Sequence, residues 1–489
     1  FAMFFWTLSL LFAAVLSALE TTHISPSNAL IINEFHVKFD LTSQTPIEVY
    51  SLRVTNKSPQ QIDTITILIP VERTVVGSVA EDAYGQPLTF TCSNKIAPVT
   101  VDEKRSNNFR ICEIKTGNPI GPEYEFKVAM LKIYYKNFYN FSPRSINLFE
   151  DQKAKIIVYK VPASPYRIEK TSLDMSYGEP SSAKTEKSEN SAVVSPLSPV
   201  STILHFVINM HFVESEITKR YIEISHWGNV YFKDLYMLHN RAAKLRGPYS
   251  TIDFNKGRKD TGRNAFKQET IRLPETAWGL FYRDEIGNIS TSTVKRESDH
   301  ISVTLKPRFS LLGDWNCTWE LSFNVPTNDI LKTHAEEGYY RFEYKLNHLL
   351  ENTPSDKYEL SIALPEGATA HRHMISTTQP YTLNNTLSFS YLDFLGRPTL
   401  QFTFENFLPR VNPDATVIVD YSLPDGLLFI EPLYLVAGLM LCFSIYLVLS
   451  KLDLSFGSED LQAMLKVHPS YAHATAVEQK NTRSAPKRK

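Results

Sequence analysis

The sequence predicts a mainly β protein, with two antiparallel β-sandwich-like domains followed by one transmembrane helix. Aromatic residues make up 12% of the chain, and glycine is sparse, with 18 residues. Many runs alternate apolar and polar residues with a period of two, which is typical of strands that are buried on one face. One uncharged apolar run near the C-terminus is long enough to cross a bilayer as a helix.

The strand pattern is clearest in residues 318–325, where Trp319, Leu321 and Phe323 alternate with polar residues. Strands are also predicted from period-two or β-branched and aromatic runs at residues 62–69, 126–135, 154–161, 203–213, 358–364, 400–405 and 417–423. Turn residues such as Gly121-Pro122 lie between these runs, and no long helical pattern separates them. Antiparallel sandwiches are therefore favoured over alternating strand–helix units.

Residues 433–450 carry no charge and predict a transmembrane helix about 27 Å long, close to the ~30 Å hydrocarbon core of a bilayer. Asp425 and Glu431 precede this run, and Lys451 follows it at once. Positive charge on the C-terminal side indicates the cytosol, so residues 451–489 are predicted to form a short cytosolic tail.

Small residues in the transmembrane run, Ala437 and Gly438, and the polar Ser444 predict a face that packs against another helix. The alternative is a generic anchor without specific contacts.

Residues 1–18 are apolar and end in small residues, which predicts a signal peptide, with a first transmembrane helix as the alternative. Together with the C-terminal run, they predict a single-pass type I protein. Residues 19–215 and 216–430 are then two lumenal β domains, each long enough to bury its own core. Residues 172–200 are rich in Ser, Pro, Glu and Lys, and are expected to form a mobile loop in the first domain.

Charge and cysteine content exclude some classes of protein. The chain has 51 basic and 52 acidic residues, so nothing indicates nucleic-acid binding. Of four cysteines, Cys442 lies in the transmembrane run. Cys92 and Cys112 are predicted to form a disulfide that closes a loop of about twenty residues, which leaves Cys317 free.

No motif for a catalytic serine, a bound nucleotide or a zinc protease occurs in the sequence. His371 and His373 have no acidic or cysteine residue nearby in sequence that could complete a metal site. We therefore expect these two histidines to lie in a solvated loop. Asp284 and Glu285 have no second carboxylate pair spaced for general acid–base catalysis, so that role is disfavoured for them. Trp227 follows His226 and could form an exposed platform that stacks against a sugar. We expect it to be a buried core residue instead. We expect no catalytic residue, no metal and no cofactor.

Five Asn-x-Ser/Thr sites occur, at Asn56, Asn140, Asn288, Asn316 and Asn384. A proline follows the serine at the first two, and cysteine is the middle residue at the fourth, which disfavours glycosylation there. Asn288 lies in a Gly-Asn turn. We predict glycosylation at Asn288 and Asn384.

Several longer motifs in the second half of the chain resemble the ribophorin I family, the large single-pass subunits of the endoplasmic-reticulum oligosaccharyltransferase. They match in order and spacing over roughly residues 220–453, and similarity is looser upstream. The motifs are His226-Trp227-Gly228-Asn229, Tyr282-Arg283-Asp284-Glu285-Ile286-Gly287-Asn288, Lys306-Pro307-Arg308-Phe309, Leu364-Pro365-Glu366-Gly367-Ala368, Tyr391-Leu392-Asp393 with Gly396-Arg397-Pro398, and Glu431-Pro432-Leu433.

The resemblance implies a non-catalytic subunit in the endoplasmic-reticulum membrane. A separate multispanning subunit of that complex transfers oligosaccharide from dolichyl diphosphate to asparagine of nascent chains. Partners would be the other subunits, including the catalytic one, and possible contacts include nascent polypeptides. Animal members carry a helical cytosolic domain thought to meet the ribosome, whereas residues 451–489 are short, which puts ribosome contact in doubt. The alternative function is a type I cell-surface receptor or adhesion protein with two β-sandwich domains.

Overall fold

The structure is a computed structural model, and it describes residues 20–102, 105–179, 182–250, 252, 254, 264–334, 338–377, 379–390, 393 and 395–452. The chain divides into two compact units that meet in sequence between Pro424 and Asp425, and each is described by itself. The predicted signal peptide, residues 1–18, lies outside the described residues, and so does the predicted cytosolic tail beyond Leu452.

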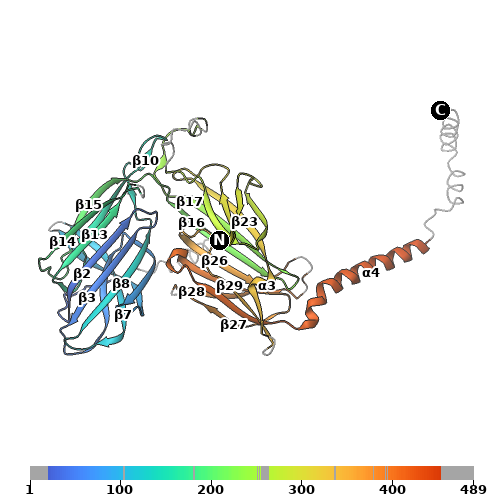
Figure 1. Cartoon of the computed structure of the whole chain (residues 1–489), viewed down its shortest axis with the longest axis horizontal. Coiled ribbons are helices and arrows are strands. Elements are labelled where there is room, and N and C mark those ends of the chain that lie inside the picture. Colours follow the sequence, from blue (N-terminus) through green and yellow to red (C-terminus); the bar gives the residue numbers. More distant parts are fainter. Residues whose placement is uncertain are drawn as a thin grey trace, which may run out of the picture. The chain divides into compact units, whose positions relative to one another are not determined.

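The first unit is built from β-strands (Figure 1). The largest sheet contains β1 (Glu20–Thr21), β2 (Leu30–Leu41), β3 (Ile47–Asn56), β4 (Ile62–Pro70), β5 (Thr74–Asp82), β6 (Pro87–Asp102), β7 (Arg105–Ile120), β8 (Glu125–Lys136), β12 (Arg167–Ile168), β13 (Thr171–Tyr177) and β14 (Lys184–Asn190). Its strand order is β14-β13-β2-β3-β8-β5-β6-β7-β4, with β1 paired to β6 and β12 paired to β2.

Two small sheets accompany it. One has the order β15-β11-β9, with β9 (Asn140–Phe141), β11 (Lys153–Val161) and β15 (Val200–Val207). The other pairs β10 (Ser145–Ile146) with β18 (Lys244–Leu245). Among the described residues, every other strand pairing joins strands that both precede Ile208 or both follow Phe212. Strand pairing therefore changes between β15 and β16, and the domain boundary predicted at residue 215 falls inside β16.

The later strands form three sheets. The seven-stranded sheet has the order β20-β23-β17-β16-β26-β29-β28, with β16 (Val213–Ile224), β17 (Asn229–Asn240), β20 (Trp278–Asp284), β23 (Asn316–Pro326), β26 (Ser355–Ala363), β28 (Tyr381–Ser388) and β29 (Arg397–Phe407). The others are β19-β22-β21 and β24-β25-β30-β27, with β19 (Glu269–Pro274), β21 (Thr293–Arg296), β22 (His300–Leu305), β24 (Leu331–His334), β25 (Tyr339–Lys345), β27 (Thr369–Ile375) and β30 (Thr416–Ser422). Two short helical turns, α3 (Thr327–Ile330) and η2 (Pro409–Val411), connect strands.

Alternation along the strands places the core of the seven-stranded sheet. In β17 nearly every second residue is buried. In the neighbouring strand β23, Trp319 is buried, with an exposed fraction of 1%. Rings of Tyr236, Phe266 and Tyr282 lie 5.6 to 6.3 Å from the Trp319 ring, centroid to centroid. Aromatic pairs at these separations add to the burial of apolar area. The aromatic content of the sequence is thus used to fill this core.

The mainly β fold predicted from the sequence is confirmed, and each predicted strand coincides with strand residues. The run 203–213 is divided, because β15 ends at Val207 and β16 begins at Val213. Most pairs are antiparallel, but β13 pairs with β2, and β16 with β26, in parallel. These parallel partners are far apart in sequence, so period-two patterns alone did not reveal them.

Residues 172–200, expected to form a loop, differ from that prediction. They contain most of β13 and all of β14, which pair over seven residues. In β13, Leu173, Met175 and Tyr177 are buried, while β14 is an exposed edge strand held by its backbone hydrogen bonds. Most of the polar residues belong to the solvent-facing strand β14. When composition is taken over the whole segment, they outweigh the apolar alternation of β13.

The second unit contains η3 (Asp425–Phe429) and the helix α4 (Ile430–Lys451). At about 1.5 Å per residue the 22 residues of α4 span roughly 33 Å, which matches the hydrocarbon thickness of a bilayer. The predicted run 433–450 lies inside it. This is the one helix among the described residues that is long and apolar enough to cross a membrane.

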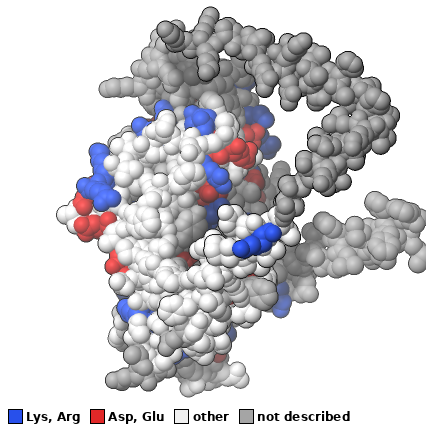
Figure 2. Space-filling model, turned by 90° about the vertical axis from the view of Figure 1, so that its right-hand side faces the viewer, with Lys and Arg blue, Asp and Glu red and all other residues white. Residues whose placement is uncertain are grey.

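Charged side chains of both signs are interspersed on the face shown in Figure 2, where red and blue groups often lie side by side. This agrees with the formal net charge of −1. No large field of one sign is visible among the described residues of this face.

Candidate functional site

Asn288 stands at the end of a tight turn that follows strand β20. The carboxylate of Asp284 accepts hydrogen bonds from the backbone N–H of Ile286 at 3.0 Å and of Gly287 at 2.9 Å. Gly287 has φ 148°, a value that side chains with a Cβ rarely adopt. Asn288 is exposed and makes an isolated β-bridge with Arg283. The turn therefore presents the Asn288 side chain to solvent.

Arg308 clamps this turn from a neighbouring loop. Its Nε donates to Asp284 Oδ2 at 2.7 Å and its Nη2 to Oδ1 at 3.0 Å. Nη2 also donates to the backbone carbonyls of Gly287 and Asn288, each at 3.2 Å. Hydrogen bonds from Arg308 lower the pKa of Asp284 to about 2. Asp284 is thus a structural anion that holds the turn, and sequence reasoning had not linked it to Arg308.

The other Asn-x-Ser/Thr sites differ in access. Asn384 lies exposed on β28, an edge strand of the seven-stranded sheet. Asn140 and Asn316 are also exposed. Asn56 is fully buried, and its Nδ2 donates to the carbonyls of Gln60 at 2.8 Å and Ile120 at 2.9 Å. A glycan cannot be attached there without breaking these bonds.

Further motifs meet at one end of the seven-stranded sheet. Arg397 Nη1 donates to Glu223 Oε1 at 2.8 Å, and its Nε donates to Asp393 Oδ2 at 2.9 Å. The Glu366 carboxylate accepts from the backbone N–H of Leu395. The Leu-Pro-Glu-Gly-Ala and Gly-Arg-Pro runs, distant in sequence, are therefore parts of one hydrogen-bonded loop cluster. Tyr391 and Leu392 of this motif lie outside the described residues.

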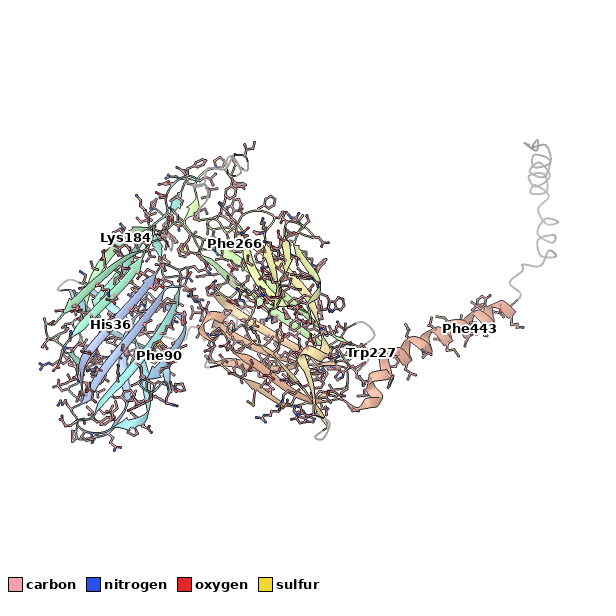
Figure 3. The ribbon with its side chains drawn as sticks, in the orientation of Figure 1. His36, Phe90, Lys184, Trp227, Phe266 and Phe443 are labelled. Carbon is pink, nitrogen blue, oxygen red and sulfur yellow. A yellow bond between two sulfur atoms is a disulfide. The ribbon has the colours of Figure 1, made fainter. Side chains whose placement is uncertain are left out.

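His226 and Trp227 belong to the turn between β16 and β17. The Nε2 atom of His226 lies 2.8 Å from the hydroxyl of Tyr421, and its ring centroid lies 4.5 Å from that of Tyr340. Burial lowers the pKa of His226. Trp227 is 60% exposed and labelled in Figure 3, so the core position expected for it is wrong. A turn residue has no strand partner to cover it, which explains the difference.

His371 and His373, for which the sequence favoured a solvated loop over a metal site, lie instead on strand β27. His371 Nε2 is 2.7 Å from Ser422 Oγ, and the His373 ring packs 5.9 Å from that of Phe402. Among the described residues, the ligand atoms of Glu297, Asp299 and His300 lie within 4.8 Å of one another. The two carboxylates are exposed, and His300 Nδ1 already lies 2.6 Å from Asp299 Oδ1. We therefore assign no metal site to these residues.

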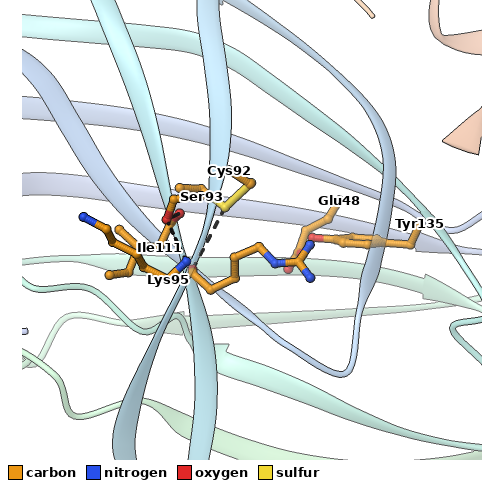
Figure 4. Close-up of a disulfide and its surroundings, with 8 residues drawn as sticks. Glu48, Cys92, Ser93, Lys95, Ile111 and Tyr135 are labelled. Atoms are coloured by element: carbon orange, nitrogen blue, oxygen red, sulfur yellow. Dashed lines mark hydrogen bonds between the residues drawn. A yellow bond between two sulfur atoms is a disulfide. The ribbon is translucent and has the colours of Figure 1, made fainter. Parts of the chain in front are cut away.

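The structure brings Cys92 and Cys112 together in a disulfide between paired positions of β6 and β7, with their Cα atoms 4.0 Å apart (Figure 4). Cys317 is unbonded and half-buried. Burial raises its pKa to about 12. A thiol with so high a pKa is a poor nucleophile at neutral pH.

The predicted packing residues lie within α4. Ser444 Oγ donates to the carbonyl of Met440 at 2.7 Å, so its hydroxyl is satisfied inside the helix. Ala437, Gly438 and Ser444 are all exposed. Helix packing at these positions stays a prediction.

The family model and the related proteins that match this chain agree on one family. The family model described as Ribophorin I matches residues 30–450. Dolichyl-diphosphooligosaccharide–protein glycosyltransferase subunit 1 of Caenorhabditis elegans is 33% identical over 260 residues, which cover 52% of this chain and 43% of that protein. Subunit 1A of Arabidopsis thaliana is 31% identical, covering 56% and 44%. Subunit 1B of Oryza sativa subsp. japonica is 25% identical, covering 88% and 93%.

The matched part of the chain thus spans less than half the length of the first two relatives. Among solved structures, an M1 zinc metallopeptidase from Deinococcus radiodurans matches with a TM-score of 0.26 and 11% identity, covering 42% of each chain. A likeness this weak carries no argument. The family match spans both the strand-rich unit and α4, and the chain belongs to the ribophorin I family.

Proposed function

We propose that this protein is a non-catalytic subunit of the oligosaccharyltransferase, the complex that transfers an oligosaccharide from dolichyl diphosphate to asparagine of Asn-x-Ser/Thr. The observation that carries the proposal is the family match over residues 30–450, together with relatives named as subunit 1 of that enzyme. Those names favour this function over a cell-surface receptor. The partners would be the other subunits, including the multispanning catalytic one.

The proposed placement is the endoplasmic-reticulum membrane, with α4 as the single span. The β-rich residues from about 20 to 430 would lie in the lumen, because Lys451 directly follows the apolar run. Two β domains with a boundary near residues 215 and 216 are part of the proposal. The change of strand pairing between Ile208 and Phe212 supports that boundary.

A non-catalytic role agrees with the chemistry of the candidate residues. Asp284 is held by Arg308 at 2.7 Å with a pKa of about 2, so it is a poor general base or acid at neutral pH. His226 is hydrogen-bonded to Tyr421. Both residues have structural roles that account for their contacts.

Depletion of the protein from cells is expected to leave reporter proteins under-glycosylated. Re-expression of the Asp284→Ala, Glu285→Ala or His226→Ala variant should restore glycosylation whenever the variant assembles, because none of these residues is placed for transfer chemistry. Reporter mobility on gels measures the outcome. A variant that assembles at the wild-type level but transfers no glycan would contradict the non-catalytic role, while normal glycosylation after depletion would contradict the function itself.

We further propose that Asn288 carries a glycan. Asn288→Gln should increase gel mobility by one glycan step, because the clamped turn holds an exposed acceptor. Ser290→Ala should give the same shift, since it removes the acceptor motif and leaves Asn288 in place. Because glycans are added in the lumen, an unchanged mobility in both variants would argue against the proposed orientation or against use of this site.

A further inference from the structure

One end of the seven-stranded sheet gathers three loops. Strand β16 ends at Ile224 and β26 ends beside it, because Glu223 pairs with Ala363. Ala363 in turn pairs with Thr399, near the start of β29. The turn 225–228, the loop 364–368 and the described residues between β28 and β29 (389, 390, 393, 395 and 396) therefore share this end, which we call the loop end.

The chain leaves the first unit at the same end. Strand β27 begins after the loop 364–368, and its first residue, Thr369, pairs with Ser422, the last residue of β30. His226 Nε2, in the turn 225–228, lies 2.8 Å from the hydroxyl of Tyr421. Only residues 423–429 separate Ser422 from α4. Even fully extended, a connection of this length reaches at most about 28 Å.

The loop end exposes large apolar side chains. Trp227 is 60% exposed, Leu387 61%, Phe389 66% and Leu395 51%. Single exposed apolar residues are ordinary on soluble proteins, but several at one end of a sheet indicate contact with an apolar surface.

The charged side chains of the three loops are buried, whereas Asp329 in the adjoining α3 is exposed. Glu366 and Arg397 are 7% and 8% exposed, and the Asp393 side chain is fully buried. Arg397 is bonded to both Asp393 and Glu223, and the Glu366 carboxylate accepts the backbone N–H of Leu395, so these charged groups have partners within the loop cluster. The described residues of the three loops therefore expose no Asp, Glu, Lys or Arg. Loops that face water would be expected to show the opposite distribution.

We propose that the loop end rests on the lipid bilayer, with Trp227, Leu387, Phe389 and Leu395 at the level of the headgroups. The inference rests on the proposed membrane-spanning role of α4, which tethers Ser422 close to the lipid. Tryptophan is the residue most typical of the interface, where its ring is partly apolar and its N–H remains hydrated. Apolar side chains that enter the acyl boundary bind according to the area they bury.

Tryptophan quenching by brominated lipid tests this contact. The full chain is reconstituted in phosphatidylcholine vesicles with bromine either near the headgroup end of the acyl chain or deep in the chain. We expect fluorescence to be quenched more strongly by the shallow bromine, and Trp227→Phe to remove the larger part of that quenching. Trp315→Phe is the matched control, because Trp315 adjoins Asn316 at the opposite end of the sheet and should leave the quenching unchanged.

A second variant keeps the tryptophan and changes its neighbours. Phe389→Ser combined with Leu395→Ser replaces two exposed side chains, so the fold should persist, and the quenching of Trp227 should weaken. Resistance to carbonate extraction verifies in every sample that α4 is inserted, which separates failure of this contact from failure of the anchor. The proposal would be overturned if Trp227→Phe and Trp315→Phe reduced the quenching equally, or if neither brominated lipid quenched the fluorescence. It would also be overturned by protection of Trp227 from aqueous acrylamide only in the assembled complex, since a protein would then cover the loop end.

Discussion

Replacing Asp234 with alanine is expected to lower the free energy of unfolding by about 3–5 kcal/mol, because it leaves a buried charge unpaired. Arg220 and Asp234 lie on neighbouring strands and are 1% and 0% exposed. Two hydrogen bonds of 2.7 Å join the guanidinium to the carboxylate, and the Tyr236 hydroxyl donates to Asp234 Oδ2 at 3.1 Å. The third nitrogen of Arg220 donates to the carbonyl of Asn347. Without Asp234, the Arg220 cation keeps only the carbonyl.

Urea unfolding of the full chain in detergent, followed by tryptophan fluorescence, measures this loss. The control is Asp174→Ala, which removes the ion pair between Asp174 and Lys187. The Asp174 side chain is 30% exposed and the Lys187 side chain is 72% exposed. Exposed pairs contribute about 0–1 kcal/mol, so the control midpoint should stay close to the wild type. Equal shifts in the two variants would mean that burial of the Arg220–Asp234 pair does not decide its contribution.

Replacing residues 433–450 with an unrelated polyleucine span is expected to reduce co-purification with the multispanning catalytic subunit and to weaken glycosylation of reporters. Lipid chains are as apolar as leucine, so helices associate in membranes through close packing and interhelical hydrogen bonds. Ala437 and Gly438 allow close approach of a partner helix, whereas leucine at these positions blocks it.

Membrane insertion should be retained, because polyleucine is apolar enough to span the bilayer. Carbonate extraction provides that control, and quantitative blotting of the purified complex gives the result. If the exchanged chain assembles as well as the original, then α4 is a generic anchor and the β-rich unit alone holds the complex together.

Local patterns predicted much of the fold. Alternation such as that of Trp319, Leu321 and Phe323 predicted β23, and the uncharged run 433–450 predicted most of α4. Residues 172–200 were misjudged because composition was averaged over a hairpin whose edge strand is polar. The alternation of Leu173, Met175 and Tyr177 was present in the sequence and would have predicted β13.

The candidate site was harder to predict because its contacts join distant segments. Asp284 and Arg308 each occur in a recognisable motif, but nothing in either motif indicates that the two side chains meet at 2.7 Å. Likewise, Arg397 bonds to Glu223, 174 residues away in sequence. Such pairs depend on strand order, and the parallel pairing of β16 with β26 is not encoded in any local pattern. The exposure of Trp227 also followed from its turn, which the aromatic content alone did not indicate.

Affinity purification of the tagged full chain in mild detergent tests the proposed function most directly. The eluate is assayed for transfer of oligosaccharide from dolichyl diphosphate to an Asn-x-Ser/Thr peptide. We predict that the chain co-purifies with a multispanning glycosyltransferase subunit and that the eluate is active, whereas the chain separated from its partners transfers no glycan. A chain that elutes alone from intact membranes, with no transfer activity in its fraction, would contradict its role as a subunit of this enzyme.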